Sequence, residues 1–294
     1  MKALGVDIGG TNARAAVVDS ETGTLLHAAK ESWSDREPSA VVETVGALID
    51  RVAKAAGSDD AKIGVGFAGM LDGNRVVNAP NLGWRDVDFG QMLAARTGRS
   101  VRLINDLSAA AWGEFSVGAA KGVTDSLTVF AGTGVGSAII SNGALLAGAS
   151  GVSGEFGHIK VVLEGGRPCG CGQTGCLEAY MGGANLEEWM REVGLVGNAA
   201  DLERQAGQGV VKARELYDFA VNHLGLAVAN LVTVLNPAVV VLGGGVLANC
   251  PGMVKRVTEL VAKRANAPAA KKVRVVMASL GDDAGLVGAA LLGR

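Results

Sequence analysis

The stretch ALGVDIGGTNARAAVVDSETGTLLHAA, residues 3–29, decides the fold. Apolar residues dominate 3–8, 13–19 and 24–29, and turns containing glycine separate these segments, so we expect three strands. Glu21, Thr22 and Gly23 are expected to form the hairpin turn between the second and the third strand. A Rossmann domain would instead enter a helix directly after its first glycines. The opening of the chain therefore predicts three successive antiparallel strands.

The rest of the chain alternates between strand and helix patterns, as in an α/β protein. We expect further strands at 62–67, 101–104, 127–131, 135–141, 238–242 and 273–277. Helices are expected at 39–56, 87–97, 107–117, 186–193, 199–205, 210–235, 253–266 and 283–292, and a polar, turn-rich loop at 78–84. The order strand, glycine and threonine turn, strand occurs near residue 7 and again near residue 132. This weak internal duplication suggests two related halves that face one cleft.

Composition and charge exclude several classes of protein. With 49% hydrophobic and 19% charged residues, the chain of 294 residues can bury a sizeable core, which excludes disorder. Its net charge of −2 argues against non-specific binding of nucleic acid. A run of about 18 apolar residues and a signal-peptide segment are both missing from the sequence. We therefore expect a soluble cytoplasmic protein that does not span a membrane and whose cysteines stay reduced.

Residues 151–180, GVSGEFGHIKVVLEGGRPCGCGQTGCLEAY, hold three of the four cysteines. Cys169, Cys171 and Cys176 form a Cys3His set with His158, which is a common closed tetrahedral zinc site. The alternatives are a disulfide and redox chemistry. Cys-x-Cys is too tight for an easy disulfide, and the spacing differs from the Cys-x-x-Cys of thioredoxin-like enzymes. The cluster therefore predicts structural zinc.

Two carboxylates, Glu155 and Glu178, lie in the same stretch as the expected zinc ligands. A metal site that holds acidic groups suggests that zinc shapes a polar pocket. Cys250, which precedes Pro251, is expected to be an ordinary free cysteine.

Three glycine-rich turns follow apolar strands, where backbone N–H groups can approach an anion. The first contains Asp7, Gly9, Gly10, Thr11 and Asn12, the second Gly132, Thr133, Gly134 and Gly136, and the third Gly243, Gly244 and Gly245. We interpret the first two as turns that hold a polyphosphate from opposite sides, and the third as suited to a nucleoside. Asp7 would hold Mg²⁺ through water, because hard cations prefer carboxylate oxygen. Each turn alone is also compatible with a purely structural role.

Asn105 and Asp106 stand where an expected strand meets an expected helix. The positive end of the helix dipole stabilises an ionised carboxylate at that position. Such a carboxylate can accept a proton from a substrate hydroxyl, which makes Asp106 a candidate general base. A role as helix N-cap is compatible with this interpretation.

Together these motifs resemble those of the ROK family of sugar kinases, within the actin, hexokinase and Hsp70 superfamily. The resemblance runs from Asp7 to the C-terminus, and its specific marks are Asn105-Asp106, the turn at 132–134, residues 155–158 and the cysteine cluster. It implies an α/β fold with two domains, actin/hexokinase-like (ribonuclease H-like), around a cleft. The small N-terminal domain would comprise 1–117 with 284–294, and the larger domain 118–283 with the zinc loop.

The same resemblance implies transfer of the γ-phosphoryl group of ATP, with Mg²⁺, to a sugar hydroxyl, with Asp106 as the base. The family's sugar contacts fall on Gly69, Asn105, Asp106, Glu155, His158 and Glu178, its zinc ligands on His158, Cys169, Cys171 and Cys176, and its ATP contacts on the three glycine turns. Residues 78–84 are similar to a loop of bacterial glucokinases, which implies phosphorylation of glucose at the 6-hydroxyl, in glycolysis. A homodimer is also implied by the resemblance.

Other functions within the family stay open at this point. The sugar could be mannose, fructose, allose or an N-acetylhexosamine in place of glucose. The family also contains sugar-sensing transcriptional repressors, which carry an N-terminal helix-turn-helix. A strand that begins at residue 3 leaves no room for this element, so we expect an enzyme and not a repressor.

Overall fold

The opening strand, β1 (Lys2–Ile8), lies at the centre of a five-stranded sheet in the computed structural model, which describes residues 1–58 and 61–293. The strand order is β3-β2-β1-β4-β8, with bounds β2 (Asn12–Asp19), β3 (Leu25–Ser32), β4 (Ile63–Phe67) and β8 (Val101–Asn105). β2 pairs antiparallel with both β1 and β3, so the predicted opening hairpins are confirmed. β4 and β8 continue the sheet in parallel with β1.

A second five-stranded sheet repeats this topology. Its order is β11-β10-β9-β12-β13, with bounds β9 (Ser126–Ala131), β10 (Val135–Ser141), β11 (Ala144–Leu145), β12 (Val239–Gly243) and β13 (Arg274–Met277). β10 is antiparallel to β9, while β12 is parallel to β9 and β13 is parallel to β12. The strand order therefore matches β3-β2-β1-β4-β8, and β9, β10, β12 and β13 also match β1, β2, β4 and β8 in direction, so the internal duplication is confirmed at the level of sheet topology.

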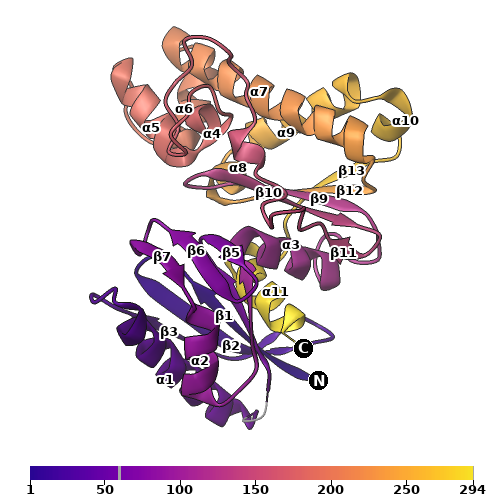
Figure 1. Cartoon of the computed structure of the whole chain (residues 1–294). Helices are drawn as coiled ribbons and strands as arrows, with labels where there is room; N and C mark the ends of the chain where they lie inside the picture. The colour runs from indigo at the N-terminus through magenta and orange to yellow at the C-terminus, as the bar shows by residue number, and fades with distance from the viewer. Residues whose placement is uncertain (59–60, 294) are drawn as a thin grey trace. The chain divides into compact units, whose positions relative to one another are not determined.

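The chain divides into two compact units (Figure 1). The first comprises residues 1–122, 144–153 and 279–294, and the second comprises 123–143 and 154–278. The boundaries expected at 117 and 284 differ from these by a few residues, and the segment 144–153 was expected in the larger domain. Arg294, the last residue of the expected segment 284–294, lies outside the described residues.

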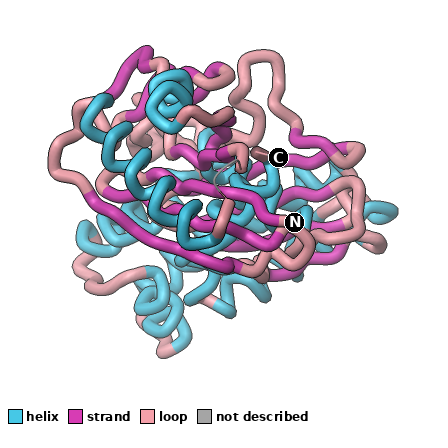
Figure 2. The backbone as a smooth tube through the Cα atoms, turned by 90° about the horizontal axis from the view of Figure 1, so that it is seen from below, coloured by secondary structure: helices cyan, strands magenta, loops and turns pink. Residues whose placement is uncertain are grey.

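Helices cover both faces of the first sheet (Figures 1 and 2). α1 (Pro38–Ala56) packs on β2, β3 and α2 (Phe89–Thr97), and buries an apolar stripe that includes Val45, Leu48 and Ile49. Full burial of such a side chain stabilises the fold by about 1.5–3 kcal/mol. The last helix, α11 (Ala284–Leu292), packs on β1, β4 and α3 (Asp106–Ser116). Its close approach requires glycine in β4, because a Cβ atom at Gly64 would lie 1.8 Å from the carbonyl oxygen of Ala289.

A three-stranded sheet in the first unit corrects one expectation. β5 (Met70–Asp72), β6 (Arg75–Ala79) and β7 (Trp84–Val87) form this antiparallel sheet. The prediction of a polar loop at 78–84 was therefore wrong at both ends, and only 80–83 form the turn. Trp84 is buried against Phe67 and Phe89, and its Nε1 donates to the carbonyl oxygen of Arg36 at 2.6 Å. Burial of the indole ring, a tertiary effect, fixes this strand.

The second unit packs a set of helices against its sheet. They are η1 (Phe156–His158), α4 (Glu178–Met181), α5 (Gly183–Glu192), α6 (Ala199–Gly207), α7 (Val211–Leu235), α8 (Gly245–Asn249), α9 (Pro251–Arg264) and α10 (Ala267–Ala270), and a second 3₁₀ turn, η2 (Gly281–Asp283), belongs to the first unit. Among the described residues, α7 alone has the length and hydropathy of a possible membrane span. Its buried side chains, such as Leu216, Leu224 and Val228, belong to the core beneath α6 and α9, so we assign α7 as a core helix.

Candidate active site

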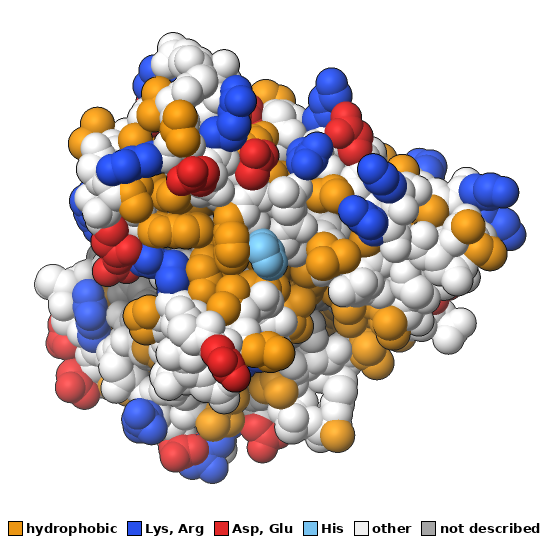
Figure 3. All heavy atoms as spheres, turned by 90° about the horizontal axis from the view of Figure 1, so that it is seen from above, with side chains coloured by type: hydrophobic (Ala, Val, Ile, Leu, Met, Phe, Trp, Pro, Cys, Tyr) orange, Lys and Arg blue, Asp and Glu red, His pale blue; other side chains and the backbone are white. Residues whose placement is uncertain are grey.

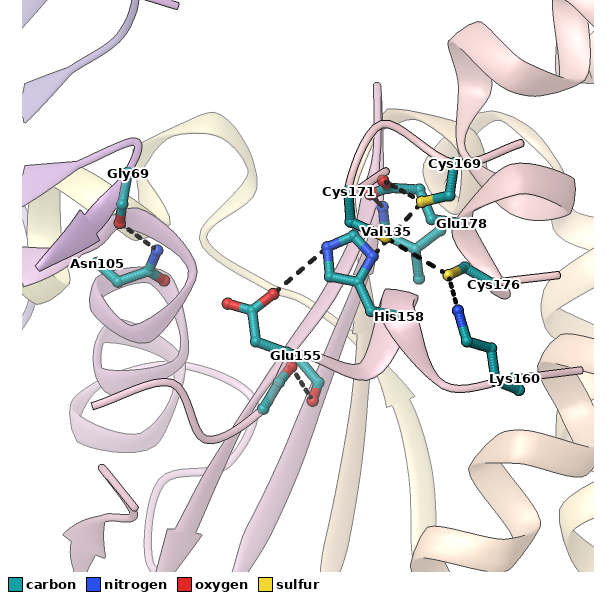
Figure 4. Close-up of polar contacts among 12 residues, drawn as sticks. Gly69, Asn105, Val135, Glu155, His158, Lys160, Cys169, Cys171, Cys176 and Glu178 are labelled. Carbon is teal, nitrogen blue, oxygen red and sulfur yellow. Dashed lines mark hydrogen bonds and ion pairs between the residues drawn. The ribbon is translucent and has the colours of Figure 1, made fainter. Parts of the chain in front are cut away.

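Three parallel strands of the first sheet bring polar groups to one edge. β1, β4 and β8 end at the same side, with Ile8 opposite Phe67 and Phe67 opposite Asn105. Asp7, Gly69 and Asn105 therefore lie at neighbouring strand ends. The side-chain Nδ2 of Asn105 donates to the carbonyl oxygen of Gly69 at 3.4 Å (Figure 4). In open α/β sheets, this carboxyl edge is where ligands bind.

Asn105 also caps the helix that carries Asp106. Its Oδ1 accepts the backbone N–H groups of Leu107 at 3.1 Å and Ser108 at 3.2 Å. The N-cap of α3 is therefore Asn105, and Asp106 is the first helical residue, with Oδ1 accepting from the N–H of Leu107 at 2.9 Å. The carboxylate stands at the positive end of the helix dipole, as the sequence predicted.

Asp7 is partly buried beside the start of α11. A Cβ atom at Gly285 would lie 3.8 Å from the Asp7 carboxylate and 3.9 Å from the backbone oxygen of Asp106, so both aspartates flank this helix start. Burial raises the pKa of Asp7, and the positive charge of Arg14 partly opposes this rise. Arg14 forms an ion pair with Asp283, just before α11. A bound cation would offset the cost of removing this carboxylate from water.

The first glycine turn is closed by the N–H of Gly9, which donates to the carbonyl oxygen of Asn12 at 3.0 Å. Gly10 packs against Asn81 in the turn between β6 and β7, where a Cβ atom would lie 2.9 Å from that of Asn81. Thr11 accepts the N–H of Trp33 at 3.1 Å through its backbone oxygen. Contacts with Asn81 and Trp33, both in the first unit, thus fix the position of this turn.

The other two glycine turns lie side by side in the second unit. They follow β9 and β12, which are neighbouring parallel strands. Gly132 donates to the carbonyl oxygen of Gly134 at 2.9 Å, and a Cβ atom at Gly132 would lie 4.0 Å from the N of Gly245. Gly244 has a φ of +85°, and a Cβ atom there would lie 2.4 Å from the carbonyl oxygen of Ala131. Only glycine fits this close approach.

The predicted zinc ligands converge in the second unit. One ligand atom each from His158, Cys169, Cys171 and Cys176 lies within 4.8 Å of all the others. Nδ1 of His158 is 3.6 Å from Sγ of Cys169, and the Sγ atoms of Cys171 and Cys176 are 3.7 Å apart (Figure 4). Zn–S bonds of about 2.3 Å and Zn–N bonds of about 2.0–2.1 Å place tetrahedral ligand atoms about 3.6–3.8 Å apart. The geometry therefore fits zinc, and all four cysteines of the chain are free of disulfides.

The thiols of the cluster differ in their environments. Burial raises the pKa of the Cys169 thiol to about 12, whereas the backbone N–H of Gln173 lowers the pKa of Cys171. Nζ of Lys160 donates to Sγ of Cys176 at 3.0 Å, and the two residues form an isolated β-bridge. Sequence reasoning missed Lys160, because its approach depends on this bridge between distant residues. The ammonium group therefore contacts one of the sulfur atoms that would bind the metal.

Glu155 and Glu178 approach the cluster from two directions. Oε2 of Glu155 lies 3.6 Å from Nε2 of His158, on the side of the ring away from the cysteines (Figure 4). Oε1 of Glu178 lies 3.7 Å from Sγ of Cys169. The second unit thus gathers Glu155, His158 and Glu178 with the cluster and two glycine turns, while the first unit gathers Asp7, Gly69, Asn105 and Asp106 with the remaining turn.

The two repeated sheets define the class of the protein. They have the actin/hexokinase-like fold, with one α/β unit built on each sheet. The description of the ROK family matches residues 3–294. The chain belongs to the ROK family.

Relatives and solved structures cover nearly the whole chain. A glucokinase of Halalkalibacterium halodurans is 33% identical, over 97% of this chain and 92% of that protein. The crystal structure of a ROK hexokinase from Thermus thermophilus has a TM-score of 0.89 at 35% identity, over 99% of this chain and 97% of that one. A ROK glucokinase from Streptomyces griseus, solved with glucose and AMPPNP, has a TM-score of 0.80 at 31% identity and covers 99% of both chains. An N-acetylmannosamine kinase of Escherichia coli is 31% identical over 99% of this chain and 98% of that protein.

Proposed function

We propose that this chain is an ATP-dependent hexose kinase that phosphorylates glucose at the 6-hydroxyl, with Asp106 as general base. The observation that carries the proposal is the junction of β8 and α3. There Asn105 fixes the helix start and leaves the Asp106 carboxylate at the positive helix end. The ROK glucokinases among its relatives support the sugar and the phosphoryl donor.

In this mechanism the groups on the chain divide between the proton, the phosphates and the sugar. Asp106 takes the proton of the attacking hydroxyl, and backbone N–H groups of the turns at 7–12 and 132–136 bind the phosphates. The turn at 243–245 would lie against the nucleoside. Mg²⁺, when bound, neutralises charge on the phosphoryl oxygens. Asp7 is the carboxylate placed to hold it, through water, at the end of β1.

The sugar would be held by Gly69, Asn105, Glu155, His158 and Glu178. Carboxylates accept sugar hydroxyls in charge-assisted hydrogen bonds, which are stronger than neutral ones. Zinc on Nδ1 of His158 would fix the tautomer and leave Nε2, which lies beside Glu155, for a sugar hydroxyl. With four protein ligands the metal has a closed shell, so its role is structural.

The proposal also covers the arrangement of the chain and its surroundings. Exclusion of water from the phosphoryl group would prevent hydrolysis of ATP in competition with the sugar. We place the enzyme in the cytoplasm, in carbohydrate metabolism, without nucleic-acid or membrane partners. A homodimer agrees with large apolar side chains exposed on the second unit, such as Leu226 and Val234, and apolar side chains gather on the face in Figure 3.

A direct assay tests the proposal. The zinc-loaded protein is incubated with glucose, ATP and Mg²⁺, and the product is identified by ³¹P NMR. We expect glucose 6-phosphate and ADP in equal amounts, and no product with Asp106→Asn on the same time scale. The second candidate function is that of an N-acetylhexosamine kinase, and it is supported by the N-acetylmannosamine kinase that is 31% identical to this chain. Activity with N-acetylmannosamine but not with glucose would favour this candidate.

A further inference from the structure

The backbone N–H and the backbone C=O of Val135, within the turn at 132–136, each contact a residue close in sequence to a zinc ligand. Oε2 of Glu178, two positions after Cys176, accepts the N–H of Val135 at 3.0 Å (Figure 4). Gly157, next to His158, packs on the carbonyl oxygen of Val135, and a Cβ atom there would lie 2.1 Å from it. Both ends of the zinc-binding stretch therefore contact the backbone of one residue, Val135.

The segment after Glu178 holds the turn itself. The N–H of Gly183 donates to the carbonyl oxygen of Gly132 at 2.8 Å, and the N–H of Ala184 donates to the carbonyl oxygen of Thr133 at 3.4 Å. A Cβ atom at Gly134 would lie 2.4 Å from Oε2 of Glu178, so the turn and the carboxylate fit only with glycine there. All of these contacts lie within the second unit.

The position of Glu178 in turn depends on the cluster. One residue, the fully buried Leu177, separates it from Cys176, and its Oε1 lies 3.7 Å from Sγ of Cys169. A metal that holds Cys169 and Cys176 would therefore also fix the start of α4. The hydrogen bond between Glu178 and the N–H of Val135 would in turn fix the backbone of the turn at 132–136.

We infer that the zinc cluster, through Glu178 as a positioning residue, presets the turn at 132–136 for the phosphates of ATP. Zinc thus governs nucleotide affinity as well as the sugar pocket. The inference rests on the proposed function, because it takes this turn as a phosphate-binding turn. It gives Glu178 a task that is independent of any contact with sugar.

Binding of AMPPNP with Mg²⁺, measured by calorimetry without sugar, tests the inference. We expect zinc removal by a chelator to raise the Kd of the wild-type protein about tenfold, because the Val135 N–H loses a fixed partner. Glu178→Ala should raise the Kd by a similar factor, and zinc removal should add little to that variant, since both act through one contact. Zinc content and thermal unfolding are measured on every sample.

Two further variants separate positioning from sugar binding. Glu178→Gln keeps an oxygen that can accept the Val135 N–H, so its nucleotide Kd should stay within about twofold while its KM for glucose rises. Glu155→Ala, which removes a carboxylate beside His158, should raise the KM for glucose and leave the nucleotide Kd unchanged.

The outcomes distinguish the inference from the proposed function. Equal nucleotide Kd values for the wild-type protein with and without zinc overturn the inference, as does a folded Glu178→Ala variant with wild-type affinity. If Glu178→Ala fails to fold, the comparison of the wild-type protein and Glu178→Gln with and without zinc decides. Failure of the zinc-loaded wild-type protein to bind the nucleotide at all overturns the proposed function as well.

Discussion

The side chain of Asn105 donates to the backbone oxygen of Gly69 at 3.4 Å, while its own oxygen caps α3. One side chain therefore ties the end of β4 to the end of β8 and fixes the first turn of the helix. Asp106 is the next residue, so its position at the strand ends is fixed as well. A general base needs such placement before its pKa matters, because proton transfer requires hydrogen-bond distance.

Asp106→Asn should lower kcat about 10²–10⁴-fold, since the amide cannot take the proton of the sugar hydroxyl. The fold should survive, because Asn105 and not Asp106 is the helix cap. Steady-state kinetics with glucose and ATP measure the effect. Asp86→Asn, at an exposed aspartate with a φ of +52°, is the matched control with wild-type kcat. A kcat above roughly a tenth of the wild-type value would show that Asp106 is not the base.

Cys171→Ser should lose zinc and raise the KM for glucose about tenfold or more, because Glu155 and His158 would no longer be fixed. Zinc content by mass spectrometry and sugar kinetics measure the two effects. Cys250→Ala, at a buried cysteine outside the cluster, should retain full zinc content. Normal sugar binding in a zinc-free Cys171→Ser protein would contradict the proposed role of the metal.

Lys160→Met should weaken zinc binding about 10–100-fold, which is the range typical of substitutions at residues that hydrogen-bond to metal ligands. The reason is that the ammonium group, 3.0 Å from Sγ of Cys176, would donate a hydrogen bond to a sulfur that binds the metal. Competition with a chromogenic chelator measures the affinity. Lys255→Met, at an exposed lysine of α9, is the control without effect. Unchanged affinity in Lys160→Met would mean that this contact does not support the metal.

Asp7→Asn should stabilise the protein at neutral pH, and the gain should disappear in acid. Burial raises the pKa of Asp7 above its ordinary 3.8, so the folded state disfavours the ionised form. Below pH 3.8 the wild-type carboxyl is protonated whether the chain is folded or not, and the two proteins should have equal stability. As the pH rises through the raised pKa, the wild-type protein loses stability and the variant does not. Thermal unfolding between pH 3 and 8 without Mg²⁺ tests this, and a gain that grows in acid would refute it.

Glu114→Ala should lower the free energy of unfolding by about 3 kcal/mol or more, since hydrogen bonds to charged groups contribute about 1.5–3 kcal/mol each. The Glu114 side chain has 0% exposure and accepts the backbone N–H groups of Ala119, Ser279 and Leu280 as well as the Ser279 hydroxyl. Urea unfolding measures the loss. Glu215→Ala, at an exposed position of α7, should change stability by less than about 0.5 kcal/mol. Equal effects of the two substitutions would disprove the account of Glu114.

The sequence predicted those parts of the fold that local patterns encode. The apolar segments in residues 3–29, with turns between them, predicted the antiparallel hairpins. The pattern of residues 39–56 predicted the helix α1. The strand at Trp84 was missed, because its pairing with β6 and the burial of its ring against Phe89 depend on distant residues. The same holds for α4, whose few residues are too short to show a helical period.

The candidate site divides in a similar way. The cysteine cluster was predictable because its chemistry is compressed into a few residues, and the ligand atoms do converge. Lys160 beside Cys176, and the bond from Val135 to Glu178, join segments that no sequence pattern connects. Asn105 was expected to contact sugar, and its function as the helix cap became visible only from its hydrogen bonds.

The most direct test of the central proposal is a ranking of sugars by kcat/KM with ATP and Mg²⁺, using zinc-loaded protein. The panel comprises glucose, mannose, fructose, allose, N-acetylglucosamine and N-acetylmannosamine. We predict that glucose ranks first and that glucose 6-phosphate is its product. A low rank for glucose would contradict the glucokinase assignment, and the absence of phosphorylation of every sugar would contradict the assignment as a sugar kinase.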